Sequence, residues 1–207
     1  MPNDPELVHI IDDDASIRSS LTWLLEAVDI AARSYDSAEA FLADLEPISV
    51  GVLILDVRMP GMSGMQLLEH LVAQESTLQI IILTGHGDVP MAVRAMSHGA
   101  FYFVQKPVNG PQLVEKVREA MLKSRAAYSQ KIRLDDIKTR FERLTPRERE
   151  VMGLIVSGCA NKVIAAELGV VERTVEVHRH RVMEKMEAAS VADLVMMQQT
   201  LTPDVAE

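Results

Sequence analysis

The sequence predicts a doubly wound α/β domain with a five-stranded parallel sheet, a helical linker, and an all-α, four-helix domain containing a helix-turn-helix. In the first part, short apolar runs alternate with segments of helical periodicity, as they do when helices cover both faces of a parallel sheet. In the last part, a short helix, a tight turn and a longer helix follow one another. We therefore expect domains at residues 1–123 and 144–207, joined by a linker at 124–143.

Five short apolar segments, each of four to six residues, are expected to be the strands. They are Leu7 to Ile11, Ile30 to Tyr35, Val52 to Leu55, Gln79 to Leu83 and Phe101 to Val104. After the first strand, apolar residues form one helical stripe: Ile17, Leu21, Leu24, Leu25 and Val28. Strict alternation of five strands with five helices indicates a flavodoxin-like arrangement.

The fifth helix is expected to begin with Pro111 at its first position, which tolerates the missing N–H. No glycine or proline occurs between Pro111 and Pro146, and the stretch is rich in residues that favour helices. We therefore expect this helix to continue, with or without a break, through Ile137 and Phe141 as a stiff connector.

The second domain shows clear signals for helix starts and ends. Thr145 and Glu148 form a capping box at the start of its first helix. Asn161 is expected to cap the second helix, which Gly169 ends, and Ser190 is expected to cap the fourth. These signals place the tight turn directly before the third, longer helix.

Charge and composition limit the classes of function. The chain carries a net charge of -9. Residues 1–123 contain 8 Lys and Arg against 17 Asp and Glu, whereas residues 124–207 contain 13 of each. The acidic part suits a cation-binding carboxylate cluster, and the neutral part can still present a basic face. Because there is no leader, no apolar run of membrane-spanning length and only Cys159 as a cysteine, we expect a soluble cytoplasmic protein with no membrane partner and no internal disulfide.

Polar residues follow four of the predicted strands, at the edge where doubly wound sheets place their sites. They are Asp12, Asp13 and Asp14 after the first strand, Asp56 after the third, Thr84 after the fourth and Lys106 after the fifth. Carboxylates suit Mg²⁺, whereas a hydroxyl and an ammonium suit a phosphoryl group. Asp56 is then the nucleophile, because a carboxylate can form an acyl phosphate. Taken alone, each aspartate is also compatible with a turn-forming role.

The segments IIDDD, ILDVRMPGMSG, ILTGHGD and FVQKP resemble, in order and spacing, the receiver domains of bacterial two-component response regulators. The resemblance implies that Asp56 is the phosphoacceptor. It also implies that Asp12, Asp13, Asp56 and the backbone carbonyl of Arg58 hold Mg²⁺. Catalysis by the chain itself would then be limited to Mg²⁺-dependent self-phosphorylation and autodephosphorylation at Asp56.

The same resemblance implies a switch next to the phosphoacceptor. Phe103 stands where the family has an aromatic side chain that swings inward on phosphorylation together with Thr84, and Lys106 contacts the phosphoryl group. His86 and Arg58 would line the mouth of the pocket and tune dephosphorylation. The phosphorylated histidine that donates the phosphoryl group would belong to a partner kinase.

Helical geometry, at about 100° per residue, divides the third helix of the second domain into two faces. Val175, Val182 and Met186 form the inner stripe, and His178 at its edge is expected to be a packed, hydrogen-bonded histidine. The outer face and its flanks offer the donors, acceptor and apolar contact that base edges in a major groove require: Arg173, Glu176, Val177, His180 and Arg181. The residues expected to contact phosphates are Lys162, Thr174 and Lys185. By periodicity alone, a charged outer face of this kind is usually only a solvated surface.

The segments LTPREREVMGLIVSGCANKVIAAELG and TVEVHRHRVMEKM resemble the LuxR-type helix-turn-helix. The whole chain resembles the NarL/FixJ subfamily of response regulators, and TGHGDVPMAVRAM resembles its FixJ branch in particular. One departure concerns Val171, where the family commonly has a serine. Because valine cannot cap, we expect the third helix to fray there or to begin at Glu172, which leaves the role of Arg173 open.

The resemblance implies a transcriptional regulator that a sensor histidine kinase phosphorylates. Its expected partners are double-stranded promoter DNA, RNA polymerase and, on phosphorylation, a second copy of the chain as a homodimer. In the fourth helix, Leu194 either packs in the core with Met197 or faces a partner together with Val195.

Two other classes of function remain open on the residues alone. A Mg²⁺-dependent phosphatase or kinase could use the same carboxylates, although the chain has no G-x-x-x-x-G-K-[ST] loop. A regulator that acts through protein contacts alone would not need an outward face of Arg, His and Lys. Binding to DNA fragments in a gel-shift assay discriminates between this last class and a transcription factor.

Overall fold

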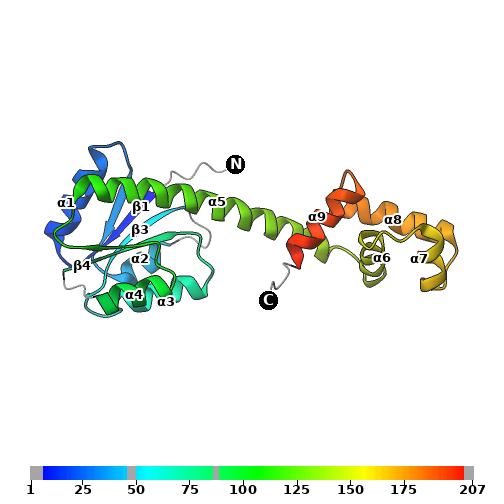
Figure 1. Ribbon diagram of the computed structural model, residues 1–207, viewed down its shortest axis with the longest axis horizontal. Helices are drawn as coiled ribbons and strands as arrows, with labels where there is room; N and C mark the ends of the chain where they lie inside the picture. The colour runs from blue at the N-terminus through cyan, green and yellow to red at the C-terminus, as the bar shows by residue number, and fades with distance from the viewer. Residues whose placement is uncertain (1–6, 46–49, 86–88, 203–207) are drawn as a thin grey trace. The chain divides into compact units, whose positions relative to one another are not determined.

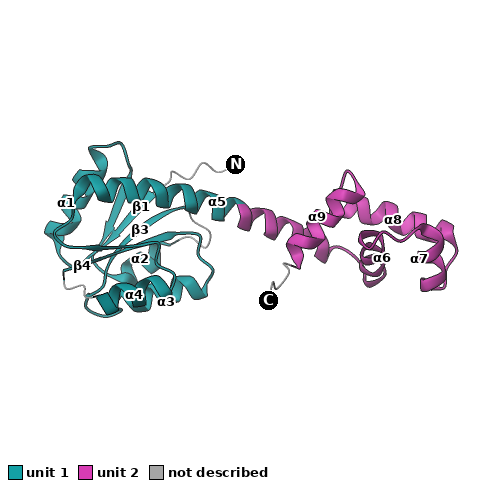
Figure 2. Cartoon of the chain, viewed as in Figure 1, with its two compact units in different colours: residues 1–129 teal, residues 130–207 magenta. Residues whose placement is uncertain are grey.

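The computed structural model describes residues 7–45, 50–85 and 89–202. The chain divides into two compact units, residues 1–129 and residues 130–207 (Figure 2). We call them unit 1 and unit 2, and each is described by itself. No helix in the described part of the chain is both long enough and apolar enough to cross a membrane.

Unit 1 contains a parallel five-stranded sheet with the strand order β2-β1-β3-β4-β5 (Figure 1). This confirms the predicted doubly wound class. The strands are β1 (Leu7–Ile11), β2 (Ala32–Tyr35), β3 (Gly51–Asp56), β4 (Gln79–Thr84) and β5 (Tyr102–Gln105). The helices between and after them are α1 (Ala15–Glu26), α2 (Ala38–Asp44), α3 (Gly64–Ala73), α4 (Val89–Ser97) and α5 (Gly110–Glu142).

Three of the predicted strand starts are wrong by one or two residues, and β3 begins at Gly51 rather than at Val52. Ile30 belongs to the turn after α1, because its N–H donates to the carbonyl of Leu25, and its apolar side chain packs in the core rather than in the strand pairing. Phe101 precedes β5, although its N–H already donates to the carbonyl of Ile80. A short apolar run therefore marks burial more reliably than it marks a strand boundary.

Helices cover both faces of the sheet (Figure 1). Leu53, Leu55, Ile80 and Ile82 belong to a core cluster that also contains buried residues of α2, α3 and α4. Val52, Ile54, Ile81 and Leu83 alternate with them along the same strands and pack with α1 and α5. The alternation follows from the period of two residues in a strand, and burial on both faces explains why these strands read as continuous apolar runs.

Helix α5 is a single helix of 33 residues, as expected for a segment without internal breakers. It begins at Gly110, so the prediction of Pro111 at the first position is wrong by one residue. Ser124 on α5 is fully buried; its hydroxyl donates to the carbonyl of Thr77 at 2.8 Å and accepts from the N–H of Gly51 at 3.0 Å. These bonds fix α5 to the chain before β4 and to the start of β3.

Unit 2 has an all-α core. After the end of α5 come α6 (Pro146–Val156), α7 (Asn161–Leu168), α8 (Glu172–Met186) and α9 (Val191–Leu201). Ile137 is buried in the core of this unit, and Phe141 packs against it. Leu194 is fully buried in the same core, which decides between the two expectations for this residue. The tight turn between α7 and α8 passes through Gly169, whose φ of 65° suits glycine.

The capping predictions for unit 2 are confirmed except at α7. Thr145 and Glu148 form the predicted capping box, and the Ser190 side chain accepts from the N–H of Asp193. At α7, Asn161 is the first helical residue, and the cap position is held by Ala160, whose side chain cannot accept a hydrogen bond. Helix α8 begins at Glu172 with Val171 at the cap position and no side-chain cap, as the Val171 departure predicts.

Candidate functional sites

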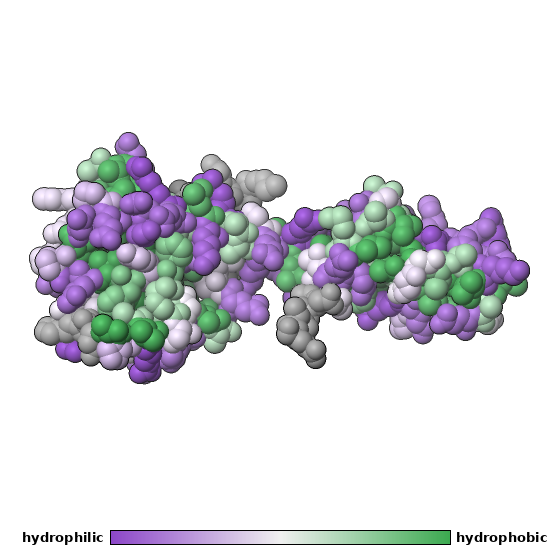
Figure 3. All heavy atoms as spheres, in the orientation of Figure 1, coloured by the Kyte–Doolittle hydropathy of each residue, from purple (hydrophilic) through white to green (hydrophobic). Residues whose placement is uncertain are grey.

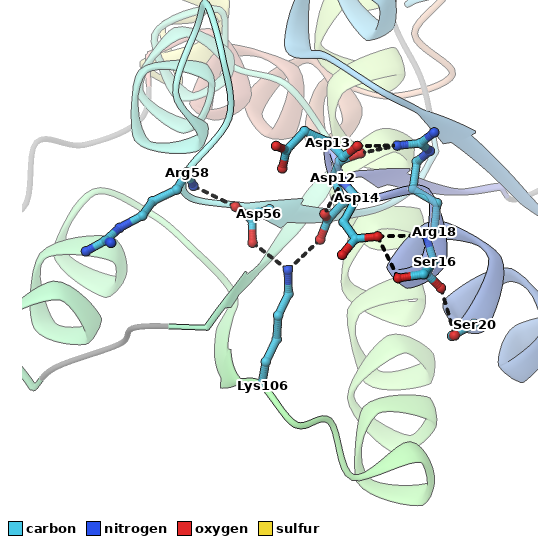
Figure 4. A network of polar contacts seen from close by, with 9 residues as sticks. All are labelled: Asp12, Asp13, Asp14, Ser16, Arg18, Ser20, Asp56, Arg58 and Lys106. Atoms are coloured by element: carbon cyan, nitrogen blue, oxygen red, sulfur yellow. Dashed lines mark hydrogen bonds and ion pairs between the residues drawn. The ribbon is translucent and has the colours of Figure 1, made fainter.

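Three of the predicted polar residues of unit 1 meet at the carboxyl edge of the sheet (Figure 4). Asp12 directly follows β1, Asp56 ends β3, and Lys106 directly follows β5. Parallel strands end at a common edge, so residues far apart in the chain come together there. Asp12, Asp56 and Lys106 form what we call the acidic pocket.

Lys106 lies between the two carboxylates of the acidic pocket (Figure 4). Its Nζ atom is 2.6 Å from Oδ2 of Asp12 and 2.7 Å from Oδ1 of Asp56. Asp12 is 1% exposed and Asp56 is 6% exposed, so the three groups interact in a region poor in water. One ammonium thus faces two buried carboxylates, which leaves the pocket with an excess of negative charge.

The pKa directions follow from this arrangement. Burial raises the pKa of Asp56, and the hydrogen bonds from Lys106 and from the Arg58 N–H oppose this effect only in part. Burial by itself lowers the pKa of Lys106, but its hydrogen bonds to Asp12 and Asp56 outweigh burial and raise it. Lys106 therefore carries its positive charge at neutral pH and can neutralise an anion in the pocket.

Backbone N–H groups hold the carboxylates in place. The N–H of Arg58 donates to Oδ2 of Asp56 at 2.6 Å, and the N–H of Asp14 donates to Oδ1 of Asp12 at 2.9 Å. Asp14 itself is the N-cap of α1, and the hydrogen bonds of its side chain with Ser16 lower its pKa. Asp14 therefore acts as a helix cap.

Arg18 also belongs to this site, although it was not predicted from the sequence. Its guanidinium donates to the backbone carbonyls of Asp12, at 2.7 Å, and Asp13, at 3.0 Å, and so ties α1 to the loop that carries the acidic residues (Figure 4). A cation near the start of a helix is disfavoured by the helix dipole. The unfavourable place of Arg18 near the start of a helix was the one feature of the sequence that could have indicated a specific partner for it.

The oxygen atoms of the acidic pocket fit a hard cation such as Mg²⁺. Asp12 and Asp56 are both buried, and the Arg58 backbone lies next to Asp56. Asp13, however, is exposed and points away from Lys106 (Figure 4). Within the described residues, no three or more His, Cys, Asp or Glu side chains are grouped so that they could hold a metal by themselves. A metal ion there would depend on two close carboxylates, backbone oxygen and water, which is common for Mg²⁺.

Thr84 and Phe103 are the two residues that the sequence predicts to form a switch. Thr84 ends β4 and is 1% exposed, and its backbone carbonyl accepts from the N–H of Lys106 at 2.8 Å. Phe103 on β5 is half-buried and packs against the core cluster that contains Ala95 of α4. The prediction for His86 lies outside the described residues.

Helix α8 of unit 2 presents two faces, as predicted. Val175, Val182 and Met186 are fully buried. The residues that are exposed on the other side are Arg173, Glu176, Val177, His180 and Arg181. Arg173 and Glu176 form an exposed ion pair at 3.0 Å. Lys162 on α7 is also exposed, and Thr174 is half-buried.

Lys185 differs from the other predicted contacts of α8. Its Nζ atom is 2.6 Å from Oε2 of Glu148 and 3.2 Å from the backbone carbonyl of Arg143. Glu148 is only 2% exposed, so this ion pair is largely removed from water. The ammonium of Lys185 is therefore engaged within unit 2, which argues against the expectation that it contacts a DNA phosphate.

The comparisons with known proteins agree with these two sites. The response regulator receiver domain family matches residues 8–118, and the luxR family of bacterial regulatory proteins matches residues 142–198. Each match contains one of the sites, the acidic pocket or helix α8. The chain therefore belongs to the two-component response regulators that combine a receiver domain with a LuxR-type DNA-binding domain. Receiver domains generally bind Mg²⁺ at their phosphorylation site.

Among the relatives, the chain is similar to FixJ proteins. It is 44% identical over 190 residues to the transcriptional regulatory protein FixJ of Azorhizobium caulinodans, covering 92% of this chain and 90% of that protein. It is 38% identical over 200 residues to the response regulator protein TmoT of Ectopseudomonas mendocina, covering 96% and 91% of the two chains. The structure of the response regulator StyR superposes with a TM-score of 0.83 at 38% identity, covering 94% of this chain and 98% of that chain.

Proposed function

We propose that this chain is a transcription factor of the bacterial cytoplasm that phosphorylation of Asp56 switches on. The observation that carries the proposal is the acidic pocket, in which one ammonium faces two buried carboxylates. In the same chain, α8 presents an outward face of Arg, Glu, Val and His residues beyond a buried stripe. The first site can accept a phosphoryl group, and the second can read DNA.

In the proposed reaction, an Oδ atom of Asp56 attacks the phosphorus of a phosphohistidine on a sensor histidine kinase. The new O–P bond forms as the P–N bond breaks, and the imidazole leaves with the electron pair. Lys106 neutralises one oxygen of the transferred group and the Thr84 hydroxyl donates to another. Mg²⁺, held by Asp12, Asp56 and the Arg58 carbonyl, and by Asp13 once its exposed side chain turns toward the pocket, would supply further neutralisation of the phosphoryl oxygens.

Phosphorylation is proposed to favour dimerisation through α4 and β5. Val89, Val93 and Met96 form a stripe on α4 and are 77%, 62% and 46% exposed, and neighbouring exposed apolar side chains mark interaction surfaces more often than isolated ones do. Apolar residues gather over α3 and α4 on the visible face of unit 1 (Figure 3). Phe103 packs in the cluster to which Met91 and Ala95 of α4 also belong, so a change at Thr84 and Phe103 can move α4. A dimer would cover the stripe.

The dimer is proposed to bind promoter DNA with two copies of α8 about one helical turn apart and to recruit RNA polymerase there. Each α8 would present Arg173, Glu176, Val177, His180 and Arg181 to base edges. Lys162 and Thr174 would contact phosphates. Because residues 124–207 carry no net charge, a single copy can neutralise few phosphates, and we expect a dimer to bind much more tightly.

The experiment that tests the proposal compares the full chain with and without acetyl phosphate and Mg²⁺. Sedimentation velocity should show a dimer only after phosphorylation, and a gel shift with genomic fragments should show tighter binding in the same sample. EDTA should prevent both changes. A strict monomer at tens of micromolar after complete phosphorylation contradicts the dimer step. No binding to any fragment would instead favour a regulator that acts through protein contacts.

A further inference from the structure

One buried side-chain atom in the described part of the chain lacks a hydrogen-bond partner, and it lies on α8. This atom is Nδ1 of His178. The prediction that His178 is a hydrogen-bonded histidine is therefore wrong for this nitrogen. A buried polar atom without a partner costs free energy, so each such atom in a folded protein needs an explanation.

The burial of Nδ1 favours one of the two neutral forms of the imidazole. A neutral imidazole has one N–H and one unprotonated nitrogen. A proton on Nδ1 would create a buried donor without an acceptor, and buried N–H groups without partners are rarer than buried acceptors without partners. The proton therefore belongs on Nε2. His178 as a whole is half-buried and Nε2 is not among the buried unpaired atoms of the described residues, so Nε2 is the end of the ring that reaches the surface.

The position of His178 on α8 indicates which part of a DNA duplex this N–H would face. His178 lies one turn from Thr174 and one turn from Arg181, on the flank between the buried stripe and the exposed face. Thr174 and Arg181 are both proposed DNA contacts. His178 lies nearer the buried stripe than Arg181 does, so in a helix that lies in the major groove it is farther from the base edges and nearer a phosphate backbone.

We propose that His178 is a DNA-binding residue whose Nε2–H donates a hydrogen bond to a backbone phosphate oxygen. This inference rests on the proposed function in DNA binding. Because Nδ1 is packed inside unit 2, the ring is held in one orientation and the donor needs no ordering on binding. A neutral donor contributes affinity without releasing a counterion, unlike a lysine.

The test uses three substitutions of the full chain, assayed at pH 8, where an ordinary imidazole is neutral. In His178→Gln, the side-chain amide reaches the place of Nε2 and keeps an outer donor. In His178→Asn, the amide reaches only the place of Nδ1, and His178→Leu has no donor. Affinity is measured for a genomic duplex that the wild type selects and for a random duplex, each at several salt concentrations. Thermal unfolding of each variant checks that unit 2 is folded.

The expected result is that His178→Leu and His178→Asn weaken binding about three- to tenfold on both duplexes, whereas His178→Gln stays within about twofold of the wild type. The salt dependence should stay unchanged in all three, whereas Lys162→Ala should lower its slope by about one. If His178→Leu does not fold, the difference in DNA affinity between His178→Gln and His178→Asn still tests the inference.

Equal binding by wild type and His178→Leu would overturn the inference, as would equal losses for Gln and Asn. A long-range ¹H–¹⁵N spectrum that shows the proton on Nδ1 in the free protein would also overturn it. Wild-type protein that binds neither duplex would overturn the proposed function itself, and the inference with it.

Discussion

Both units bury a carboxylate against a lysine ammonium, but the two sites differ in their balance of charge. In unit 1, Lys106 faces Asp12 and Asp56 together, and burial raises the pKa of Asp56. In unit 2, Lys185 faces Glu148 alone. There burial also acts to raise the pKa, but the hydrogen bonds from Lys185 and from the Thr145 backbone outweigh it and lower the pKa of Glu148 to about 2.

The difference shows how similar residues come to serve chemistry in one place and stability in another. The carboxylate of Glu148 has its charge matched by Lys185, and its Oε2 atom also accepts from the Thr145 N–H within the capping box, so little is gained by binding anything else. The acidic pocket has more negative charge than Lys106 can neutralise, which is the condition in which a metal cation binds favourably. Neutralising one carboxylate should therefore have different consequences at the two sites.

The largest effect is expected at the acidic pocket. Asp56→Asn should abolish labelling by acetyl phosphate, because the amide keeps the shape of the side chain but loses the nucleophile. Its stability should not fall, since the substitution removes one of two carboxylates that compete for Lys106. Intact-mass spectrometry measures the label, and urea unfolding measures the stability. Asp14→Asn is the matched control and should be labelled like the wild type, because Asp14 caps α1. Undiminished labelling of Asp56→Asn would move the acceptor elsewhere.

A large loss of stability is expected when the ion pair between Lys185 and Glu148 is broken. Glu148→Gln should destabilise unit 2 by about 3 to 5 kcal/mol, because it leaves the Lys185 ammonium partly buried without its counter-charge. Glu150→Gln removes an exposed pair with Arg147 and should cost less than about 1 kcal/mol. Urea unfolding followed by circular dichroism measures both. Equal losses in the two variants would show that the burial of Glu148 does not matter.

The same pair should make unit 2 sensitive to acid. The pKa of Glu148 is lowered from 4.5 to about 2, so its ionised form stabilises the folded state above pH 4.5. This contribution, about 3 kcal/mol, is lost as the pH falls from 4.5 through 2. Stability of the wild type should therefore fall more steeply between pH 5 and pH 2 than that of Glu148→Gln. If the stability of the wild type and of Glu148→Gln fell in parallel with pH, Glu148 would not be the group that makes unit 2 sensitive to acid.

The smallest effects are expected on the DNA-reading face. Val177→Ala or His180→Ala should each reduce the preference for a selected duplex over a random one by about 1 to 3 kcal/mol, because the shortened side chain no longer reaches its base edge. Lys162→Ala should weaken binding to both duplexes alike. Footprinting with quantified affinities measures the difference. If Lys162→Ala changed the preference while the α8 variants left it unchanged, α8 would have to be rotated in the groove.

Much of this protein could be predicted because its signals are local. The strand and helix order follows from hydrophobic period, and the cap residues Thr145 and Ser190 act on N–H groups three residues away. The site residues Asp12, Asp56 and Lys106 could be predicted because each comes at or just after the end of a parallel strand, so their meeting requires only the sheet order.

Only the tertiary structure decided the contacts between side chains of separate helices. Lys185 and Glu148 are 37 residues apart, and nothing local distinguishes this lysine from one free to bind phosphate. The burial of Nδ1 in His178 likewise depends on how α8 packs in its unit. Periodicity gives the face of a helix on which a residue lies, but the partner of a charged group depends on the packing of the whole unit, because burial and distance set its electrostatic energy.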